Sequence, residues 1–159
     1  MNARFRVSIV GICIASLLSG CGSVTSGIAF SPPPGWTGTP AVFGHFQMWM
    51  KNGQQRDSAQ ILMLVKGSSS QTAANLTDLP PQYNRNMTMV KHGPVTMCGT
   101  QSGEQYTALG EGRDHKQMRI EMTTTVIGSD RYTAMYLRPA AMTPDAQAET
   151  AIHSLCPVK

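Results

Sequence analysis

The chain has 159 residues, of which 41% are hydrophobic, and its 13 lysines and arginines outnumber its 9 aspartates and glutamates. This length is enough for one domain with a hydrophobic core. The basic residues form no cluster along the chain, so the composition argues against a surface that binds nucleic acid.

The first 20 residues have the order of a secretion signal. Arg4 and Arg6 precede an apolar stretch at residues 7–18, and small residues follow it. The apolar stretch is shorter than the roughly 20 residues that a helix needs to cross a bilayer. We therefore expect residues 1–20 to be removed, together with two of the basic residues.

This segment ends in Leu18-Ser19-Gly20-Cys21, which resembles the lipobox of bacterial lipoproteins. In that family the cysteine thiol receives a diacylglyceryl group, the chain is cut before the cysteine, and the new amino terminus is usually acylated, with palmitate as the expected acyl group. The resemblance implies that Cys21 is the lipidated first residue of the mature protein. Two or more acyl chains give a stable membrane anchor. The alternative is that Cys21 is an ordinary thiol after a short buried helix.

The resemblance also implies a location in the cell envelope. Gly22 follows the cysteine, where lipoproteins retained at the inner membrane commonly have Asp. We therefore expect an anchor in the outer membrane and a domain that faces the periplasm. Residues 21–29 should form the lipidated cysteine and a short tether, and residues 30–159 a single domain.

Cys98 and Cys156 remain once Cys13 leaves with the signal and Cys21 carries lipid. In an oxidising compartment, two remaining cysteines most simply form a disulfide. The bond would close a long loop and stabilise the fold by roughly 4 kcal/mol. The alternative, a nucleophilic Cys98, has no flanking motif to support it.

The folded part is expected to begin at "FSPPPGW", residues 30–36, where prolines stiffen a first strand. Residues 43–53 alternate, with Phe46, Met48 and Met50 on one face, and predict a half-buried strand. Residues 61–65 are apolar at every position and predict a central strand with both faces covered. Residues 68–81, "SSSQTAANLTDLPP", predict a short helix that ends at the two prolines.

A run of further strands is predicted in the second half. Residues 87–90 and 94–99 read as strand segments separated by a break at His92-Gly93-Pro94. Residues 117–127 alternate between an apolar face and a face expected to meet water, which holds Arg119, Glu121, Thr123 and Thr125. Residues 131–139 form another alternating strand after a turn at residues 128–130.

The C-terminal segment predicts an amphipathic helix. Thr143 can cap it, and Pro144 fits the first helical position. The apolar stripe comprises Ala148, Ala151, Ile152 and Leu155. Cys156, at the end of this helix, would join it to the strand that ends at Cys98.

The order of these elements resembles the Mog1/PsbP-like fold. The residues that carry the resemblance are "FSPPPGW", "ILMLVKG", "RYTAMYLRP" and "DAQAETAIHSLC", within residues 28–158. The resemblance implies an α+β domain, in which an antiparallel sheet is flanked by helices and the amphipathic C-terminal helix packs on the sheet. Bacterial lipoproteins with this fold are generally non-catalytic binding modules, and no functional residue carries over from the family.

No catalytic motif is present in the sequence. It lacks G-x-S-x-G, H-E-x-x-H and C-x-x-C, and its four histidines are scattered without the spacing of metal ligands. We therefore expect no enzyme activity, no catalytic or metal-binding residues and no cofactor. Methionines recur in pairs on predicted strand faces, where their thioethers could either bind Cu(I) or fill the core; the pairs are Met48 and Met50, Met87 and Met89, and Met118 and Met122.

These features together predict a membrane-anchored envelope lipoprotein that acts as a non-catalytic binding or assembly module. Its partners would be the membrane, through the lipid, and an envelope protein of unknown identity, with no role for nucleic acid. The alternative is a periplasmic lipoprotein that binds a small ligand or copper. Four aromatic residues are candidates for either a contact surface or the core: Trp36, Trp49, Tyr132 and Tyr136.

Overall fold

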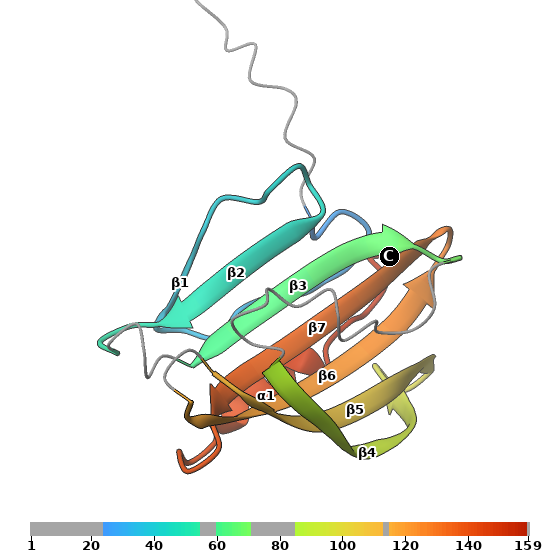
Figure 1. Ribbon diagram of the computed structural model, residues 1–159. Coiled ribbons are helices and arrows are strands. Elements are labelled where there is room, and N and C mark those ends of the chain that lie inside the picture. The colour runs from blue at the N-terminus through green and yellow to red at the C-terminus, as the bar shows by residue number, and fades with distance from the viewer. Residues whose placement is uncertain (1–23, 55–59, 71–84, 113–114, 159) are drawn as a thin grey trace, which may run out of the picture.

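The computed structural model describes residues 24–54, 60–70, 85–112 and 115–158. Seven strands form one antiparallel sheet in the order β1-β2-β3-β7-β6-β5-β4 (Figure 1). Their bounds are β1 (Trp36–Gly38), β2 (Phe46–Lys51), β3 (Ile61–Ser68), β4 (Arg85–Met97), β5 (Gln101–Glu111), β6 (Gln117–Ile127) and β7 (Asp130–Pro139), followed by helix α1 (Ala146–Ile152). Within the described part of the chain, no helix has the length and apolar character needed to cross a membrane.

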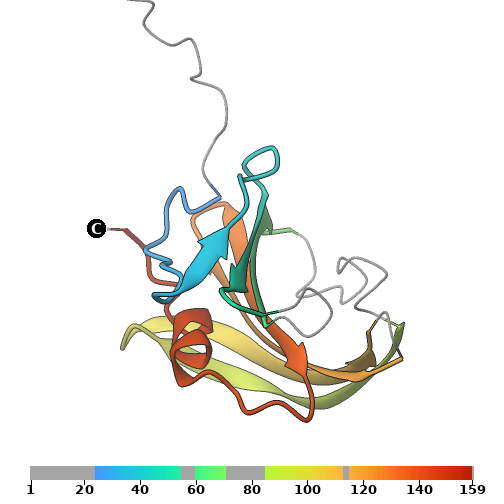
Figure 2. The same ribbon diagram turned by 90° about the vertical axis from the view of Figure 1, so that its left-hand side faces the viewer.

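The protein is almost entirely antiparallel β, so the predicted α+β class with helices flanking the sheet is wrong. In the described residues the seven-residue α1 is the only helix. The physical reason lies in the long strands β4 to β7, which have 10 to 13 residues each. These strands build a strongly curved sheet (Figure 2), which leaves little for helices to cover. Most of the helix predicted at residues 68–81 lies outside the described residues.

Strand β4 runs without interruption through His92-Gly93-Pro94, where the sequence predicted a break. It pairs with β5 from Arg85 opposite Glu111 to Met97 opposite Gln101, with two register shifts on the way. β4 lies at the edge of the sheet. A proline is tolerated in an edge strand because one side of that strand has no neighbour that needs its missing N–H.

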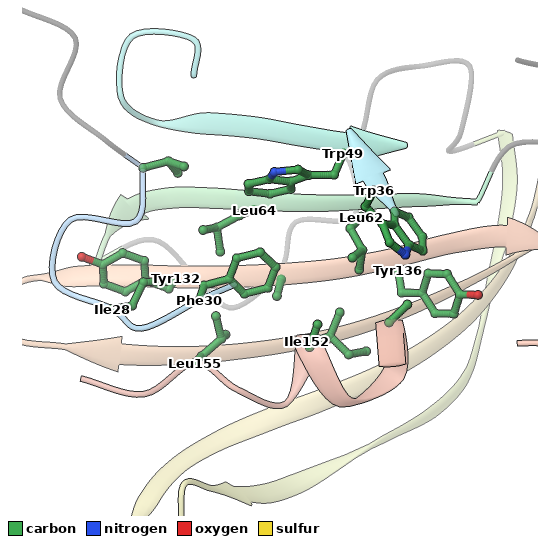
Figure 3. Close-up of a cluster of buried hydrophobic side chains, with 14 of the residues drawn as sticks. Ile28, Phe30, Trp36, Trp49, Leu62, Leu64, Tyr132, Tyr136, Ile152 and Leu155 are labelled. Carbon is green, nitrogen blue, oxygen red and sulfur yellow. The ribbon is translucent and has the colours of Figure 1, made fainter. Parts of the chain in front are cut away.

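One core lies between the sheet and α1. Figure 3 shows aromatic and aliphatic side chains gathered there from β1, β2, β3 and β7, with Ile152 and Leu155 on the opposite side of the cluster. All four aromatic residues that the sequence left open belong to this core: Trp36, Trp49, Tyr132 and Tyr136 are 8%, 5%, 1% and 0% exposed. The four apolar residues predicted for the helix stripe are also buried.

A second core covers the other face of the sheet. It contains Ile61, Ile120 and Leu137, with Phe46 and Val65 packed at its margin. The predicted alternation of residues 46–51 is confirmed, because Trp49 joins the first core while Phe46, Met48 and Met50 contact the second. The central position predicted for residues 61–65 is also confirmed, since this strand pairs with β2 and β7; residues 61–64 are buried and Val65 is half-buried.

Helix α1 is capped by Asp145, two residues later than the predicted cap at Thr143. The Asp145 carboxylate accepts hydrogen bonds from the backbone N–H groups of Gln147 and Ala148. It also forms an ion pair of 2.6 Å with Lys51 at the end of β2. A carboxylate satisfies the free N–H groups of a first turn better than a hydroxyl does when a cation also contacts it.

The N-terminal segment packs on the domain as soon as the described chain begins. Val24 and Ile28 are 0% and 3% exposed and belong to the first core. Ile28 forms an antiparallel bridge with Pro157, and the Tyr132 hydroxyl donates to the carbonyl of Ser26. Residues 24–29, predicted to be part of a tether, are therefore folded against the domain.

Candidate functional site

The predicted site residues differ in how far the structure describes them. Cys21 lies outside the described residues, so its lipidation stays a prediction. Cys98 and Cys156 form a disulfide with a Cα–Cα distance of 5.8 Å. The bond joins the turn after β4 to the chain just beyond α1, so it ties the sheet edge to the C-terminal segment.

A polar groove lies beside the C-terminal end of α1, over β4, β5 and β6. Its position follows from the strand register, which places Lys91, Thr107 and Glu121 next to one another on three strands. Helix α1 packs mainly on β6 and β7, and Thr123 fixes it there by donating to the carbonyl of Ile152. The part of this sheet face beyond the helix therefore remains open.

The groove is charged and has a volume of about 220 Å³. Its polar lining consists of Lys91, Gln105, Thr107, Arg119, Glu121 and His153. A space of this size is smaller than the roughly 300 Å³ at which pockets begin to enclose a drug-sized ligand. Its shape and polarity suit side chains on a partner's surface better than an enclosed small molecule.

Glu121 is the centre of the charge arrangement in the groove. Its carboxylate accepts a hydrogen bond of 2.7 Å from Arg119 Nε and lies 3.6 Å from Arg138 Nη2. Arg138 is only 6% exposed and also donates to the carbonyl of Met142 at 2.7 Å. Burial lowers the pKa of His153 below its ordinary value, although Glu121 and Glu149 oppose this shift. The neutral form of His153 is therefore favoured, and the charge offered to a partner comes from Lys91, Arg119 and Glu121.

A second polar cluster lies on the opposite face of the sheet, near its edge. The His92 and Tyr106 rings stack with centroids 4.3 Å apart, and the Tyr106 hydroxyl donates to Glu104. Burial, followed by the hydrogen bond to Glu104, raises the pKa of Tyr106 to about 12. Tyr106 therefore stays protonated at neutral pH and acts as a fixed hydrogen-bond donor.

The four histidines remain apart, as their scattered positions predicted. His45 precedes β2, His92 is in β4, His115 is in the loop before β6, and His153 follows α1. Among the described residues, no three His, Cys, Asp or Glu side chains come together in a way that could hold a metal ion.

Methionines form a row across the second face of the sheet. Strand register places six side chains side by side on consecutive strands: Met48, Met63, Met135, Met122, Tyr106 and His92. Met63, Met122 and Met135 are 1%, 2% and 4% exposed. Of the paired methionines noted in the sequence, Met118 and Met122 are buried, whereas Met89 is 43% exposed. Packing in the second core accounts for the buried thioethers of Met63, Met122 and Met135.

The sequence did not predict the groove. Its residues lie on four elements, and only strand pairing brings Lys91 close to Arg119 and Glu121. The available signal was the alternation of residues 117–127, which correctly placed Arg119 and Glu121 on one face. The same alternation placed Thr123 and Thr125 toward water, and this is wrong: both are buried, at 0% and 2% exposed, and α1 covers Thr123.

Comparisons with known proteins identify the fold. No known protein family and no curated protein matches the sequence. The solved structure of the cyanobacterial PsbP protein (CyanoP) from Synechocystis sp. PCC 6803 matches with a TM-score of 0.60 and 16% identity, over 94% of this chain and 99% of that chain. LpqN, described as involved in cell envelope biogenesis of Mycobacterium tuberculosis, matches with a TM-score of 0.56 and 14% identity, over 79% of each chain. The protein therefore has a PsbP-like fold, as the sequence resemblance predicted.

Proposed function

We propose that this protein is a lipid-anchored, non-catalytic binding module of the bacterial cell envelope that holds a protein partner at the membrane surface. The observation that carries the proposal is the burial of Val24, which is 0% exposed and lies three residues after Cys21. Three residues span at most about 11 Å. A lipid on Cys21 would therefore hold the folded domain directly against its membrane.

The structural neighbours support an envelope role. LpqN is involved in cell envelope biogenesis, and its fold is similar to that of this chain. The disulfide fits an oxidising compartment outside the cytoplasm. Gly22 after the lipidated cysteine favours the outer membrane, with the domain facing the periplasm.

The charged groove is the proposed contact surface for the partner. It exposes Lys91 and Arg119 beside Glu121 and lies against the short helix α1. Charge pairs at such a surface give specificity and orientation more than affinity. We expect a partner that presents carboxylates toward Lys91 and Arg119.

Mass spectrometry and site-specific crosslinking in the native host test this proposal. The intact mass of the membrane-extracted protein should equal that of a chain that begins at Cys21 and carries acyl chains. Reduction of the disulfide should raise this mass by two hydrogen atoms. A photo-crosslinking residue at position 91 should capture a discrete envelope protein, and Lys91→Glu should weaken that complex several-fold.

The matched control is Lys116, which is also exposed but lies in the loop before β6, outside the groove. Crosslinks of equal yield from positions 91 and 116 would contradict the groove as the contact surface. A mature protein without lipid would contradict the membrane anchor.

A further inference from the structure

The loop between β1 and β2 exposes two apolar side chains beside the N-terminal segment. Phe43 is 89% exposed and Val42 is 49% exposed. We propose that this loop, residues 40–45, inserts into the bilayer that holds the lipid on Cys21, so that the domain has a second membrane contact and a fixed orientation. The inference rests on the lipid anchor of the proposed function.

Backbone contacts place the loop and the N-terminal segment at the same end of the sheet. The N–H of Lys66 donates to the carbonyl of His45 at 2.7 Å, which fixes the loop to the end of β3. Lys66 is in register with Tyr132 on β7, and the Tyr132 hydroxyl donates to the carbonyl of Ser26. Figures 1 and 2 show the beginning of the described chain beside this loop in both views.

The exposed apolar side chains are unevenly distributed over the molecule. The large hydrophobic residues exposed among those described are Val42, Phe43, Met89, Val90, Val126 and Val158. Val158 donates its N–H to Gly27 in the N-terminal segment, and Val126 precedes the turn into β7 at this same end. Four of the six therefore lie at the end of the sheet where the described chain begins, and the other two lie in the irregular part of β4.

The loop backbone holds Phe43 outward in a defined turn. The N–H of Val42 donates to the carbonyl of Phe46 at 2.7 Å, and the N–H of His45 donates to the carbonyl of Val42 at 3.0 Å. Phe43 and Gly44 have φ angles of 49° and 70°. A bulky residue rarely adopts a positive φ, and such conformations concentrate at functional positions. Phe43 is thus exposed within a turn whose backbone is held by hydrogen bonds.

The chemistry of this end fits a bilayer surface. The charges of Lys66 and Asp130 are paired at 2.9 Å, so this pair presents little net charge to the membrane. Side chains of interfacial segments reach roughly 5–10 Å into the boundary between headgroups and acyl chains. A lipidated Cys21 within about 11 Å of Val24 would hold this end of the sheet close to the bilayer.

The test uses the full lipoprotein in vesicles of phosphatidylethanolamine and phosphatidylglycerol, with or without lipids brominated in their acyl chains. Phe43→Trp adds an indole at the loop, whereas the native Trp36 and Trp49 are buried and provide a constant background. We expect brominated lipids to quench the added fluorescence strongly. Lys116→Trp, in the exposed loop before β6, is the matched control and should not be quenched.

The outcomes separate this inference from the proposed function. Quenching of Phe43→Trp but not of Lys116→Trp would support insertion of the loop. An unquenched Phe43→Trp in protein whose intact mass shows lipid on Cys21 would overturn the loop insertion and leave the anchor in place. An intact mass without lipid would overturn both.

Discussion

Tyr136 joins three parts of the core through one hydroxyl group. It is 0% exposed, donates to the Gln60 side chain and accepts the N–H of Asp145 at 2.9 Å. Burial is the largest cause of the raised pKa of this hydroxyl, so it stays protonated at neutral pH. The hydroxyl thereby connects the start of β3 to the cap of α1.

We expect Tyr136→Phe to lower the free energy of unfolding by about 1–3 kcal/mol, because it leaves a buried amide oxygen and a backbone N–H without their partner. Urea denaturation followed by circular dichroism measures the change. Tyr106→Phe is the control and should cost less, since its partner Glu104, on β5, is solvent-accessible. Equal losses in the two variants would contradict the special role of Tyr136.

Asp145 makes the stability of the protein depend on pH. Burial opposes its ionisation, but hydrogen bonds from Lys51, Gln147 and Ala148 outweigh this and lower its pKa. A carboxyl group with a lower pKa in the folded state stabilises the fold above its unfolded value, near 4, and loses that effect as pH falls through the folded value. We therefore expect the stability contributed by this group to begin to fall below about pH 4 and to be lost at lower pH.

Asp145→Asn tests this expectation, because asparagine keeps a helix cap without the charge. At pH 7 the variant should be less stable by about 1 kcal/mol or less, as for other partly exposed ion pairs. At pH 3 the difference should shrink. Urea unfolding at both pH values checks it, and a difference that grows on acidification would refute the sign.

At the scale of elements, the disulfide joins the turn after β4 to the segment that follows α1. Cys98 and Cys156 are separated by 58 residues along the chain. Cross-linking a loop of this length stabilises a fold by roughly 4 kcal/mol. We expect reductant to lower the melting temperature of the native protein but to leave the Cys98→Ala/Cys156→Ala double variant unchanged. Identical melting with and without reductant would contradict this contribution.

The methionine row gives a second expectation at the element scale. Met63 belongs to this row and is 1% exposed, and its truncation to alanine leaves a cavity. Met63→Ala should lower the free energy of unfolding by about 2–5 kcal/mol. Met89→Ala, at an exposed site on β4, should change it by less than about 0.5 kcal/mol. Chemical denaturation measures both variants. Equal changes in their free energies of unfolding would contradict a packing role for Met63.

Local sequence patterns predicted the strands in which burial of side chains follows directly from the order of apolar and polar residues. Alternation identified β2, β6 and β7, and the apolar run identified β3, because each pattern records which side chains are buried. The break at His92-Gly93-Pro94 was predicted wrongly because local rules do not reveal that β4 lies at an edge, where proline is tolerated. The helix cap was misplaced because Lys51, far away in sequence, favours Asp145.

For the molecule as a whole, the PsbP-like fold was predicted from element order, but the helical layers were not present among the described residues. The groove could not be predicted, since its charges meet only through the register of three strands. The pairing of Cys98 with Cys156 was predictable, because these two cysteines remain once Cys13 is assigned to the signal and Cys21 to the lipid.

At the scale of the whole molecule, the proposed lipid anchor depends on a single residue, Cys21. Cys21→Ala removes the thiol that would receive the lipid. We expect this variant to remain uncleaved and to be lost from the membrane fraction. Fractionation and intact-mass measurement check this. Cys98→Ala is the control, because it should weaken the fold without changing attachment. A Cys21→Ala protein that is processed normally would contradict the lipobox.

The pairing of the two chain ends also sets how the protein responds to a mechanical load. The N–H of Ala29 donates to the carbonyl of Cys156, and the N–H of Val158 donates to the carbonyl of Gly27. Val24, Ile28 and Phe30 of the same segment are buried in the first core. Tension applied through the proposed lipid anchor would break these contacts in sequence. Detachment of residues 24–30 from the domain would lengthen the chain between Cys21 and the sheet by up to about 25 Å. The covalent bond from Cys156 to Cys98 would stop the C-terminal segment from following, so the domain could extend its reach without unravelling the sheet.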